Sequence, residues 1–440
     1  MRALQFRRQE LRYAAAAVGS RLFGSDGAKV GPLKLAEVDP IELPGPGWVR
    51  VRPRLAGICG SDLATVAGES ARYFEPFVSF PFTLGHEVVG EDEEGRRVVL
   101  EPVLGPQARG FVPPWPDAAP GDGDDYGHLV TGELEPGIQI GYCASTGGGW
   151  SSEFVAHRTQ LHVVPEALSD EAAVMIEPLA VAVHGVFRGN IPAGATVAVL
   201  GAGTMGLLTV AALRALHPDC RILVGAKYRH QQELARSFGA DQVVEPAGLR
   251  RAVRRAVGCH LIGKDLAGGA DVTVDTLGSS ASIREAISVT RPRGRVVLLG
   301  MPAGVRLELT ALWHRETELV GSYCYCTETL SSGERRSSFA LAIDLAAGLG
   351  DQLGSLVSAS YPLDRYTDAI AHASAAGNRA SVKVCFDLRG EKRRCSAPTP
   401  PPPPKRAASP PEPPGPDTRD TARARPAGRT RTAGRHANKT

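Results

Sequence analysis

Short runs of alternating apolar and polar residues fill the chain up to about residue 185. Such alternation places every second side chain on one face of a strand, and turn-forming residues separate the runs. We therefore expect residues 1–185 to form a β-rich, antiparallel domain. The predicted strands are 48–51, 83–90, 97–101, 153–155 and 161–164.

A different pattern follows, in which short runs that are apolar throughout alternate with stretches of helical periodicity. Buried parallel strands read as continuous apolar runs, and helices connect them. We expect residues 186–322 to form a doubly wound parallel sheet, and 323–388 to return to the β-rich domain, so that the fold class is α/β. The apolar runs are Thr196–Leu200, 221–224, Gln242–Val244, 272–275 and 295–299.

Two stretches show neither pattern. Segment 103–140 is rich in proline, glycine and acidic turns, and a connection of this length is uncommon without a function or disorder. The tail, residues 389–440, is rich in proline and has 13 Lys/Arg against 4 Asp/Glu. We expect it to be disordered, because it has too few apolar residues for a core. It is interpreted either as a solvated extension or as a basic element that binds nucleic acid or an anionic surface.

The net charge of +3 conceals two parts of opposite sign. Outside the tail the chain has 37 basic and 43 acidic residues, so nucleic acid is not the expected partner of the folded part. No apolar run reaches 18 residues, and we expect no membrane span. The apolar patch at 13–18 is too short for a signal peptide and has no usable cleavage site, so we also expect no secretory leader.

The eight cysteines are sparse and irregularly spaced, which is typical of a reduced protein, and we expect a cytoplasmic location. Cys324 and Cys326 flank a single residue in what the pattern predicts to be an apolar strand. A redox pair is the alternative interpretation of these two thiols. The cysteines stand at positions 59, 143, 220, 259, 324, 326, 385 and 395.

A glycine-rich loop directly follows the predicted strand Thr196–Leu200 and precedes an apolar helix at 207–216. In the pattern GxGxxG, Gly201 permits a tight turn, Gly203 lets the backbone approach a pyrophosphate, and Gly206 allows the helix to pack closely on the strand. The helix N-terminus supplies amide donors for the phosphates. This context predicts a dinucleotide site; a glycine-rich structural turn is the alternative.

The next strand bears on the choice between NAD and NADP. A site for NAD places a carboxylate near the end of this strand, where it binds the ribose 2′-hydroxyl. Here the strand ends in Gly225 and Ala226, and the cations Lys227 and Arg229 follow. Cations suit a 2′-phosphate, so we expect NADP to be preferred over NAD. Alternatively, both cations belong to the solvated start of the next helix.

Four side chains that favour zinc are distributed over the first 180 residues: Cys59, His86, Glu87 and Glu177. A thiolate, an imidazole and one or two carboxylates can bind Zn²⁺ and leave one position open for substrate. Asp62 is placed to orient His86 through its other ring nitrogen. Taken singly, these residues could equally be a buried cysteine, a satisfied core histidine and surface acids.

Together the motifs resemble the zinc-dependent medium-chain dehydrogenases, and most closely the branch of sorbitol and threonine dehydrogenases. Over residues 1–388 the resemblance implies a GroES-like catalytic domain (1–185 and 323–388) and a Rossmann domain (186–322). The motifs are Gly-Ile-Cys-Gly-Ser-Asp at 57–62, Gly-His-Glu at 85–87, Glu-Pro-Leu at 177–179, the glycine loop at 201–206, Asp-Thr-Leu-Gly at 275–278, the run at 293–301 and Glu-Leu-Val-Gly-Ser-Tyr at 318–323.

The resemblance also implies roles for single residues. Cys59 and His86 are expected as direct zinc ligands, and Glu87 as a ligand that binds directly or exchanges with water. Glu177 is expected either to bind zinc or to hold a water on it. Ser61 is expected to take the proton of the substrate hydroxyl, and Asp62 to support the site.

Two positions depart from the family pattern. Many alcohol dehydrogenases of the family carry a second, structural zinc on four closely spaced cysteines, but no cysteine lies between Cys59 and Cys143, so we expect a single catalytic zinc. Many relatives also have a histidine five residues after the ligand cysteine that completes a proton relay. Here that position is Ala64, so the route of the proton past Ser61 differs.

These observations predict a zinc-dependent alcohol or polyol dehydrogenase that exchanges hydride between a secondary alcohol, or its ketone, and NADP. As in the family, we expect a homo-dimer or homo-tetramer that acts on a small molecule. Two alternatives stay open: a zinc-free NADPH reductase on the same fold, and a non-catalytic binding protein that kept the fold.

Overall fold

The structure is a computed structural model that describes residues 1–24 and 26–391. The prediction of a disordered tail therefore lies, from residue 392 onward, outside the described residues. The described residues all belong to one compact unit. Within the described ranges, no helix combines the length and the apolar character that a membrane crossing requires.

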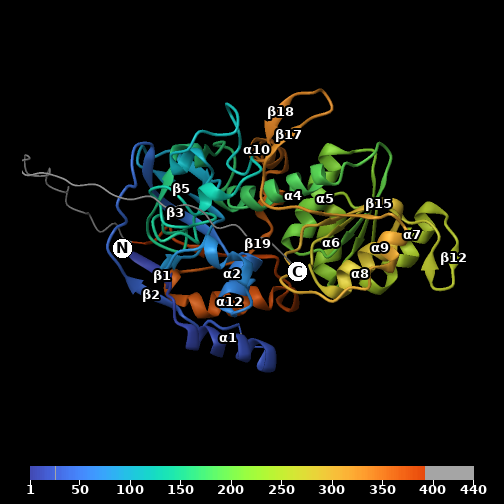
Figure 1. Cartoon of the computed structure of the whole chain (residues 1–440), viewed down its shortest axis with the longest axis horizontal. Helices are drawn as coiled ribbons and strands as arrows, with labels where there is room; N and C mark the ends of the chain where they lie inside the picture. Colours follow the sequence, from blue (N-terminus) through green and yellow to red (C-terminus); the bar gives the residue numbers. More distant parts are fainter. Residues whose placement is uncertain (25, 392–440) are drawn as a thin grey trace, which may run out of the picture. The chain divides into compact units, whose positions relative to one another are not determined.

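A seven-stranded sheet forms the frame of the β-rich lobe (Figure 1). Its central strand, β3 (Trp48–Gly57), pairs antiparallel with three others. One of them, β20 (Lys383–Asp387), comes from the far end of the folded chain, so the last segment completes the first domain. The other strands of this sheet are β5 (Val88–Asp92), β6 (Arg97–Leu100), β7 (Phe154–His157), β8 (Leu161–Val163) and β19 (Val357–Tyr361).

A small antiparallel sheet lies in the same lobe, in the order β2-β1-β4. It joins β1 (Arg2–Phe6), β2 (Leu33–Glu37) and β4 (Phe82–Thr83). Between β1 and β2 the chain makes a long excursion that contains α1 (Glu10–Phe23). The sequence pattern indicated only a short apolar patch in this excursion.

The second lobe is a six-stranded parallel sheet with the strand order β11-β10-β9-β14-β15-β16. This is the doubly wound order in which the first strand, β9, lies next to the fourth, and a ligand binds beyond the carboxyl ends where the order reverses. The expected α/β class, with a GroES-like and a Rossmann-type part, is confirmed. The strands are β9 (Thr196–Leu200), β10 (Arg221–Gly225), β11 (Gln242–Val244), β14 (Ala270–Asp275), β15 (Thr290–Leu298) and β16 (Glu318–Gly321).

Helices α4 (Ile176–Arg188), α5 (Thr204–Leu216) and α10 (Ser338–Leu349) pack together where the two lobes meet (Figure 1). One apolar cluster runs from Leu55 of the first sheet to Val197 of the second. Burial of this shared apolar surface stabilises the two lobes as one unit.

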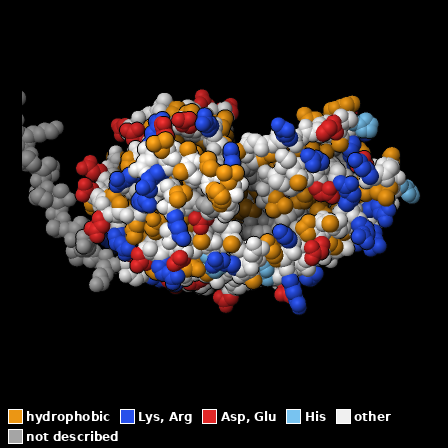
Figure 2. All heavy atoms as spheres, turned by 90° about the horizontal axis from the view of Figure 1, so that it is seen from below, with side chains coloured by type: hydrophobic (Ala, Val, Ile, Leu, Met, Phe, Trp, Pro, Cys, Tyr) orange, Lys and Arg blue, Asp and Glu red, His pale blue; other side chains and the backbone are white. Residues whose placement is uncertain are grey.

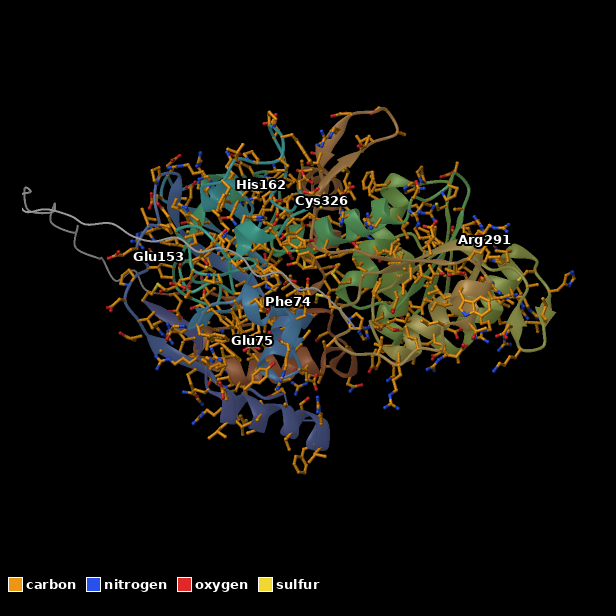
Figure 3. All side chains as sticks on the ribbon, viewed as in Figure 1. Phe74, Glu75, Glu153, His162, Arg291 and Cys326 are labelled. Carbon is orange, nitrogen blue, oxygen red and sulfur yellow. The ribbon has the colours of Figure 1, made fainter. Side chains whose placement is uncertain are left out.

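The prediction of a strand through Cys324 and Cys326 is wrong. Cys324 has a positive φ of 53°, which breaks an extended chain, and a hairpin of β17 (Thr327–Thr329) and β18 (Arg335–Ser337) follows instead. Figure 3 shows Cys326 near His162 of β8. The ring of the preceding residue, Tyr325, packs edge-on against Phe339. The ring of His162 stacks on the same phenylalanine.

The proline- and glycine-rich segment 103–140 is ordered around one buried cation, Arg109. Its guanidinium donates hydrogen bonds to the backbone oxygens of His128, Leu129 (2.8 Å), Leu134 (3.4 Å) and Glu135 (3.0 Å). A guanidinium has five donors, so one side chain can satisfy several carbonyls that face inward from a loop.

Candidate active site

Cys59 lies where the central strand of the first lobe turns into a helix. Strand β3 ends at Gly57, and Cys59 is the residue that precedes α2 (Gly60–Val66). The carboxylate of Asp62, in the first turn of α2, accepts a hydrogen bond from the Cys59 backbone nitrogen at 3.0 Å. This bond satisfies a donor that the helix start would leave free and fixes where the cysteine side chain begins.

His86 and Glu87 reach the same place from the turn between β4 and β5. Gly85 has a φ of +98°, and a Cβ there would lie 2.4 Å from Trp150, so only glycine fits this turn. One ligand atom each from Cys59, His86 and Glu87 lies within 4.8 Å of the other two. The structure thus brings together three of the side chains that the sequence predicted as metal ligands.

The environment of His86 favours a positive charge. Its Nδ1 lies 3.4 Å from Oδ1 of the fully buried Asp62, but the geometry is too poor for a hydrogen bond and Nδ1 has no other partner. Burial lowers the pKa of His86, whereas Asp62 and Cys59 raise it more, and the net shift is upward. The donor set is soft enough and negative enough to suit Zn²⁺.

The sequence analysis missed Lys383, which contacts Glu87 from the other end of the folded chain. Its ammonium donates to both carboxylate oxygens of Glu87, at 2.7 and 2.5 Å, and both side chains are buried. Gly57 makes room for this contact, because a Cβ there would lie 2.0 Å from Oε2 of Glu87. A lysine directly before the apolar run Val384–Phe386 was the signal that could have found it.

Glu177 stands apart from the three-residue group. It lies in the first turn of α4, is buried, and accepts a hydrogen bond of 3.3 Å from the hydroxyl of Tyr325. Burial raises the pKa of Glu177 to about 7, and the charges that act on it are those of His86, Glu87 and Lys383. Glu177 therefore faces the cluster but is not among the side chains whose ligand atoms converge within 4.8 Å.

A chain of hydroxyl groups leads from Asp62 through Tyr142 and Thr65 to Ser70. The Tyr142 hydroxyl donates to Oδ1 of Asp62 at 3.5 Å and lies 3.2 Å from Oγ1 of Thr65, which in turn lies 2.9 Å from Oγ of Ser70. Ser61, in the first turn of α2, is half-buried. Of the residues in this region, only Ser61 and Asp62 were predicted as site residues; Tyr142, Thr65 and Ser70 were not.

The glycine loop has the geometry that the motif predicts. Gly201 has a φ of +99°, and a Cβ on Gly206 would lie 2.1 Å from the oxygen of Gly201. In contrast, nothing lies within 4 Å of a Cβ on Gly203, which stands at the start of α5. The open side of Gly203 thus leaves space beside the helix N-terminus for a phosphate.

Lys227 and Arg229 both follow β10 on the surface. Lys227 lies over the ring of Tyr228, with its ammonium 5.3 Å from the centroid, and the hydroxyl of Tyr228 bonds Asn378 at 2.8 Å. Arg229 begins α6 (Arg229–Ser237) and pairs with Glu233 at 2.9 Å. Both cations are free to turn toward a ligand, because these contacts are solvent-exposed and weak.

Two family models match the chain. The model described as an alcohol dehydrogenase GroES-like domain matches residues 45–166, and the model described as a zinc-binding dehydrogenase matches residues 204–344. Sorbitol dehydrogenase of Arabidopsis thaliana is 30% identical over 329 residues, which are 68% of this chain and 82% of that protein. The chain belongs to the zinc-dependent medium-chain dehydrogenases, in the sorbitol dehydrogenase-like branch.

Other relatives agree with this family membership. Human sorbitol dehydrogenase is 29% identical over 349 residues, which cover 77% of this chain and 89% of that protein. A crystal structure of a zinc-binding dehydrogenase from Sinorhizobium meliloti, bound to NADP, is 26% identical with a TM-score of 0.61 and covers 82% and 97% of the two chains. The resemblance read from the motifs is confirmed, and the chain is an oxidoreductase of this zinc-binding family.

Proposed function

We propose that this dehydrogenase exchanges hydride between a secondary alcohol or polyol and NADP, with one catalytic zinc. The convergence of Cys59, His86 and Glu87 within 4.8 Å carries the proposal. Membership in the sorbitol dehydrogenase-like branch supports a small polyol, or the corresponding ketone, as the substrate class. A bound zinc would supply Lewis-acid polarisation of the reacting oxygen, and the nicotinamide would supply the hydride chemistry.

The protein's own residues then have distinct tasks. Cys59 and His86 hold the metal, and Glu177 acts from α4 as a further ligand or as the holder of a water. Asp62 orients His86 through the attraction of its carboxylate to the ring nitrogen 3.4 Å away. Glu87 is shared between the metal and Lys383, whose ammonium at 2.5 Å competes for its carboxylate. Ser61 Oγ accepts the proton that the substrate hydroxyl loses. Since position 64 is alanine, the proton leaves Ser61 through the cofactor ribose, water or another side chain.

The preference for NADP is supported by the residues that follow β10. No carboxylate stands there, and both Lys227 and Arg229 are exposed. A dianionic 2′-phosphate gains charge-assisted hydrogen bonds from such cations, whereas the 2′-hydroxyl of NAD does not. The glycine loop of Gly201, Gly203 and Gly206 holds the pyrophosphate in either case.

The decisive experiment measures metal content and turnover on the same purified protein. We expect about one equivalent of zinc by elemental analysis, and turnover of polyols or their ketones that is faster with NADP(H) than with NAD(H). NADPH turnover with zinc below about a tenth of an equivalent would favour the zinc-free reductase. Inactivity towards a panel of polyols, amino alcohols and ketones, with zinc and cofactor both bound, would favour a non-catalytic binding protein.

Assembly and location are part of the same proposal. We expect a homo-dimer or homo-tetramer, as implied by the family resemblance, with no nucleic acid or membrane needed for catalysis. A cytoplasmic location is supported by the cysteines: all seven that lie in the described residues are free thiols. A reducing compartment maintains thiols in that state.

A further inference from the structure

Helix α1 leaves four large apolar side chains exposed to solvent, while Tyr13 packs, partly buried, against the core of the lobe. Leu11, Val18, Leu22 and Phe23 are 88%, 54%, 69% and 82% exposed, whereas Ala16 is fully buried. A surface helix normally has the opposite polarity. Figure 2 views the underside of the molecule and shows hydrophobic side chains gathered over the part of the surface that α1 occupies.

The inward face of α1 is built for close contact with α2. A Cβ on Gly68, just after α2, would lie 2.8 Å from the oxygen of Tyr13 and 3.0 Å from Cβ of Ala17. Beside this contact the Ser20 hydroxyl bonds Glu69 at 2.5 Å. Together with Tyr13, whose ring packs edge-on against Phe6, these close contacts hold the helix in place and fix which face it turns outward.

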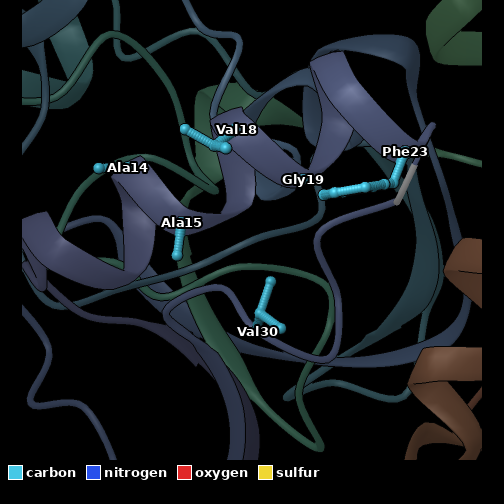
Figure 4. Close-up of a pocket in the computed structure, with 6 residues that line it drawn as sticks. All are labelled: Ala14, Ala15, Val18, Gly19, Phe23 and Val30. Atoms are coloured by element: carbon cyan, nitrogen blue, oxygen red, sulfur yellow. The ribbon is translucent and has the colours of Figure 1, made fainter.

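The outward face includes a hollow as well as protruding side chains. Figure 4 shows the hollow, of about 550 Å³. An apolar hollow beside protruding leucines is complementary to a surface of the same kind. Its lining comes from α1 and the turn that follows: Ala14, Ala15, Val18, Gly19, Phe23 and Val30.

The apolar residues on the outward face of α1 are spaced symmetrically about the middle of the helix. Leu11, Ala15, Val18 and Leu22 are separated by four, three and four residues, the seam spacing of two packed helices. In an antiparallel pair related by a two-fold axis, Leu11 lies opposite Leu22 of the second copy, and Ala15 lies opposite Val18. A two-fold contact requires this self-complementarity.

We infer that α1 is a self-association surface, on which α1 of a second copy of this chain packs antiparallel. Leu11, Val18, Leu22, Phe23 and Val30 together leave roughly 400 Å² of apolar surface uncovered, at on the order of 100 Å² per large aliphatic side chain and about 200 Å² for phenylalanine. A stable interface buries about 800 Å² per partner. The five side chains alone supply about half of that area, so residues around them must also be buried in the pair.

An anionic lipid surface is the rival occupant, because Arg12, Arg21 and Lys29 lie near the apolar face. Two observations favour the second copy. The hollow needs a protruding side chain to fill it, and the seam is symmetric, which a lipid surface does not require. This inference does not rest on the proposed substrate or cofactor.

Sedimentation of the full chain tests the association. We expect Leu22→Glu to halve the mass of the largest species, since a carboxylate would be buried at the seam. The matched control is Ile262→Glu, which places the same charge on an equally exposed apolar residue (71%) of the hairpin β12–β13 (Leu261–Ile262 and Asp265–Leu266). An unchanged mass for Leu22→Glu, with unchanged circular dichroism, would overturn the inference.

Disulfide trapping tests the antiparallel arrangement itself. We expect a mixture of Leu11→Cys and Leu22→Cys chains to cross-link on mild oxidation, and Leu11→Cys alone to stay uncross-linked. In the proposed pair the two copies of residue 11 lie roughly 16 Å apart, at 1.5 Å per residue, too far for a disulfide. Equal cross-linking of both samples would contradict the arrangement. A lipid-binding face would give a different result. The wild type would then sediment with phosphatidylserine vesicles, and Leu22→Glu would lose this vesicle binding while the mass of its largest species stayed unchanged.

Discussion

The ammonium of Lys383 lies 2.5 Å from Oε2 of Glu87 and 2.7 Å from Oε1, and the two side chains are buried together. The pair brings a positive charge into a site that otherwise gathers a thiol, an imidazole and carboxylates. Burial lowers the pKa of Lys383, but Glu87 and Cys59 raise it more, so the lysine stays charged. Lys383 thus balances the negative charge of Glu87 when no metal does so.

We predict that Lys383→Met destabilises the protein by about 3 kcal/mol in the absence of metal, because it leaves a buried carboxylate without a partner. Added zinc should reverse much of this loss, since the cation takes over Glu87. Urea unfolding with and without zinc measures both effects. The control is Lys383→Arg, which keeps the charge. Equal destabilisation of the methionine variant with and without zinc would show that Glu87 does not face the metal.

Cys59→Ser should remove most of the bound zinc and most of the activity, because a neutral hydroxyl is a far weaker zinc ligand than a thiolate. Elemental analysis and turnover should fall together. Cys220→Ser changes a buried thiol away from the proposed ligands and should keep the zinc. A Cys59→Ser enzyme that turns over normally without zinc would refute the assignment.

The double variant Lys227→Ala/Arg229→Ala should raise the KM for NADP by about 10- to 100-fold, which corresponds to roughly one or two lost charge-assisted hydrogen bonds. The KM for NAD should change little, because NAD has no 2′-phosphate. Arg221→Ala is the matched control, since Arg221 begins β10 at the opposite end and bonds the oxygen of Ala256. If both cofactors weaken equally, the cations act on something other than the 2′-phosphate.

Arg109→Met should destabilise segment 103–140 by about 3 kcal/mol, because several inward-facing carbonyls lose their donor. The variant should unfold at lower urea concentration and expose this segment to proteases first. Arg158→Met serves for comparison: Arg158 pairs with Glu94, both side chains are about half-exposed, and such a pair contributes less than about 1 kcal/mol. Identical behaviour of the two variants would mean that Arg109 does not organise the segment.

The sequence predicted best those features that are local in the chain. Strand β9 has the predicted bounds Thr196–Leu200. A short run of mainly apolar residues that is followed directly by a glycine-rich turn is typical of a buried strand, and the glycine marks its end. The glycine loop is equally local. In both cases the residue types directly determine the backbone shape. The turn that carries His86 and Glu87 was not predicted, because the pattern indicated a continuous strand over 83–90, whereas β4 ends at Thr83, β5 begins at Val88 and Gly85 has a φ of +98°.

Long-range and tertiary effects escaped prediction. Lys383 and Glu87 are 296 residues apart in the chain, and no local pattern relates them. At Cys324 a left-handed backbone overrides the strand preference of its neighbours. Helix α1 extends well beyond the apolar patch at 13–18, and its inward face packs at close range against Gly68, a contact that no local pattern indicates.

The placement of α1 has a consequence for how the protein can change. Strands β1 and β2 pair directly from Arg2–Glu37 to Phe6–Leu33, so the two ends of the excursion are already clamped next to each other. A segment of almost any length can be spliced into such a junction at small entropic cost. Oligomeric partners could thus be gained or exchanged at this junction during evolution while the catalytic architecture is inherited unchanged.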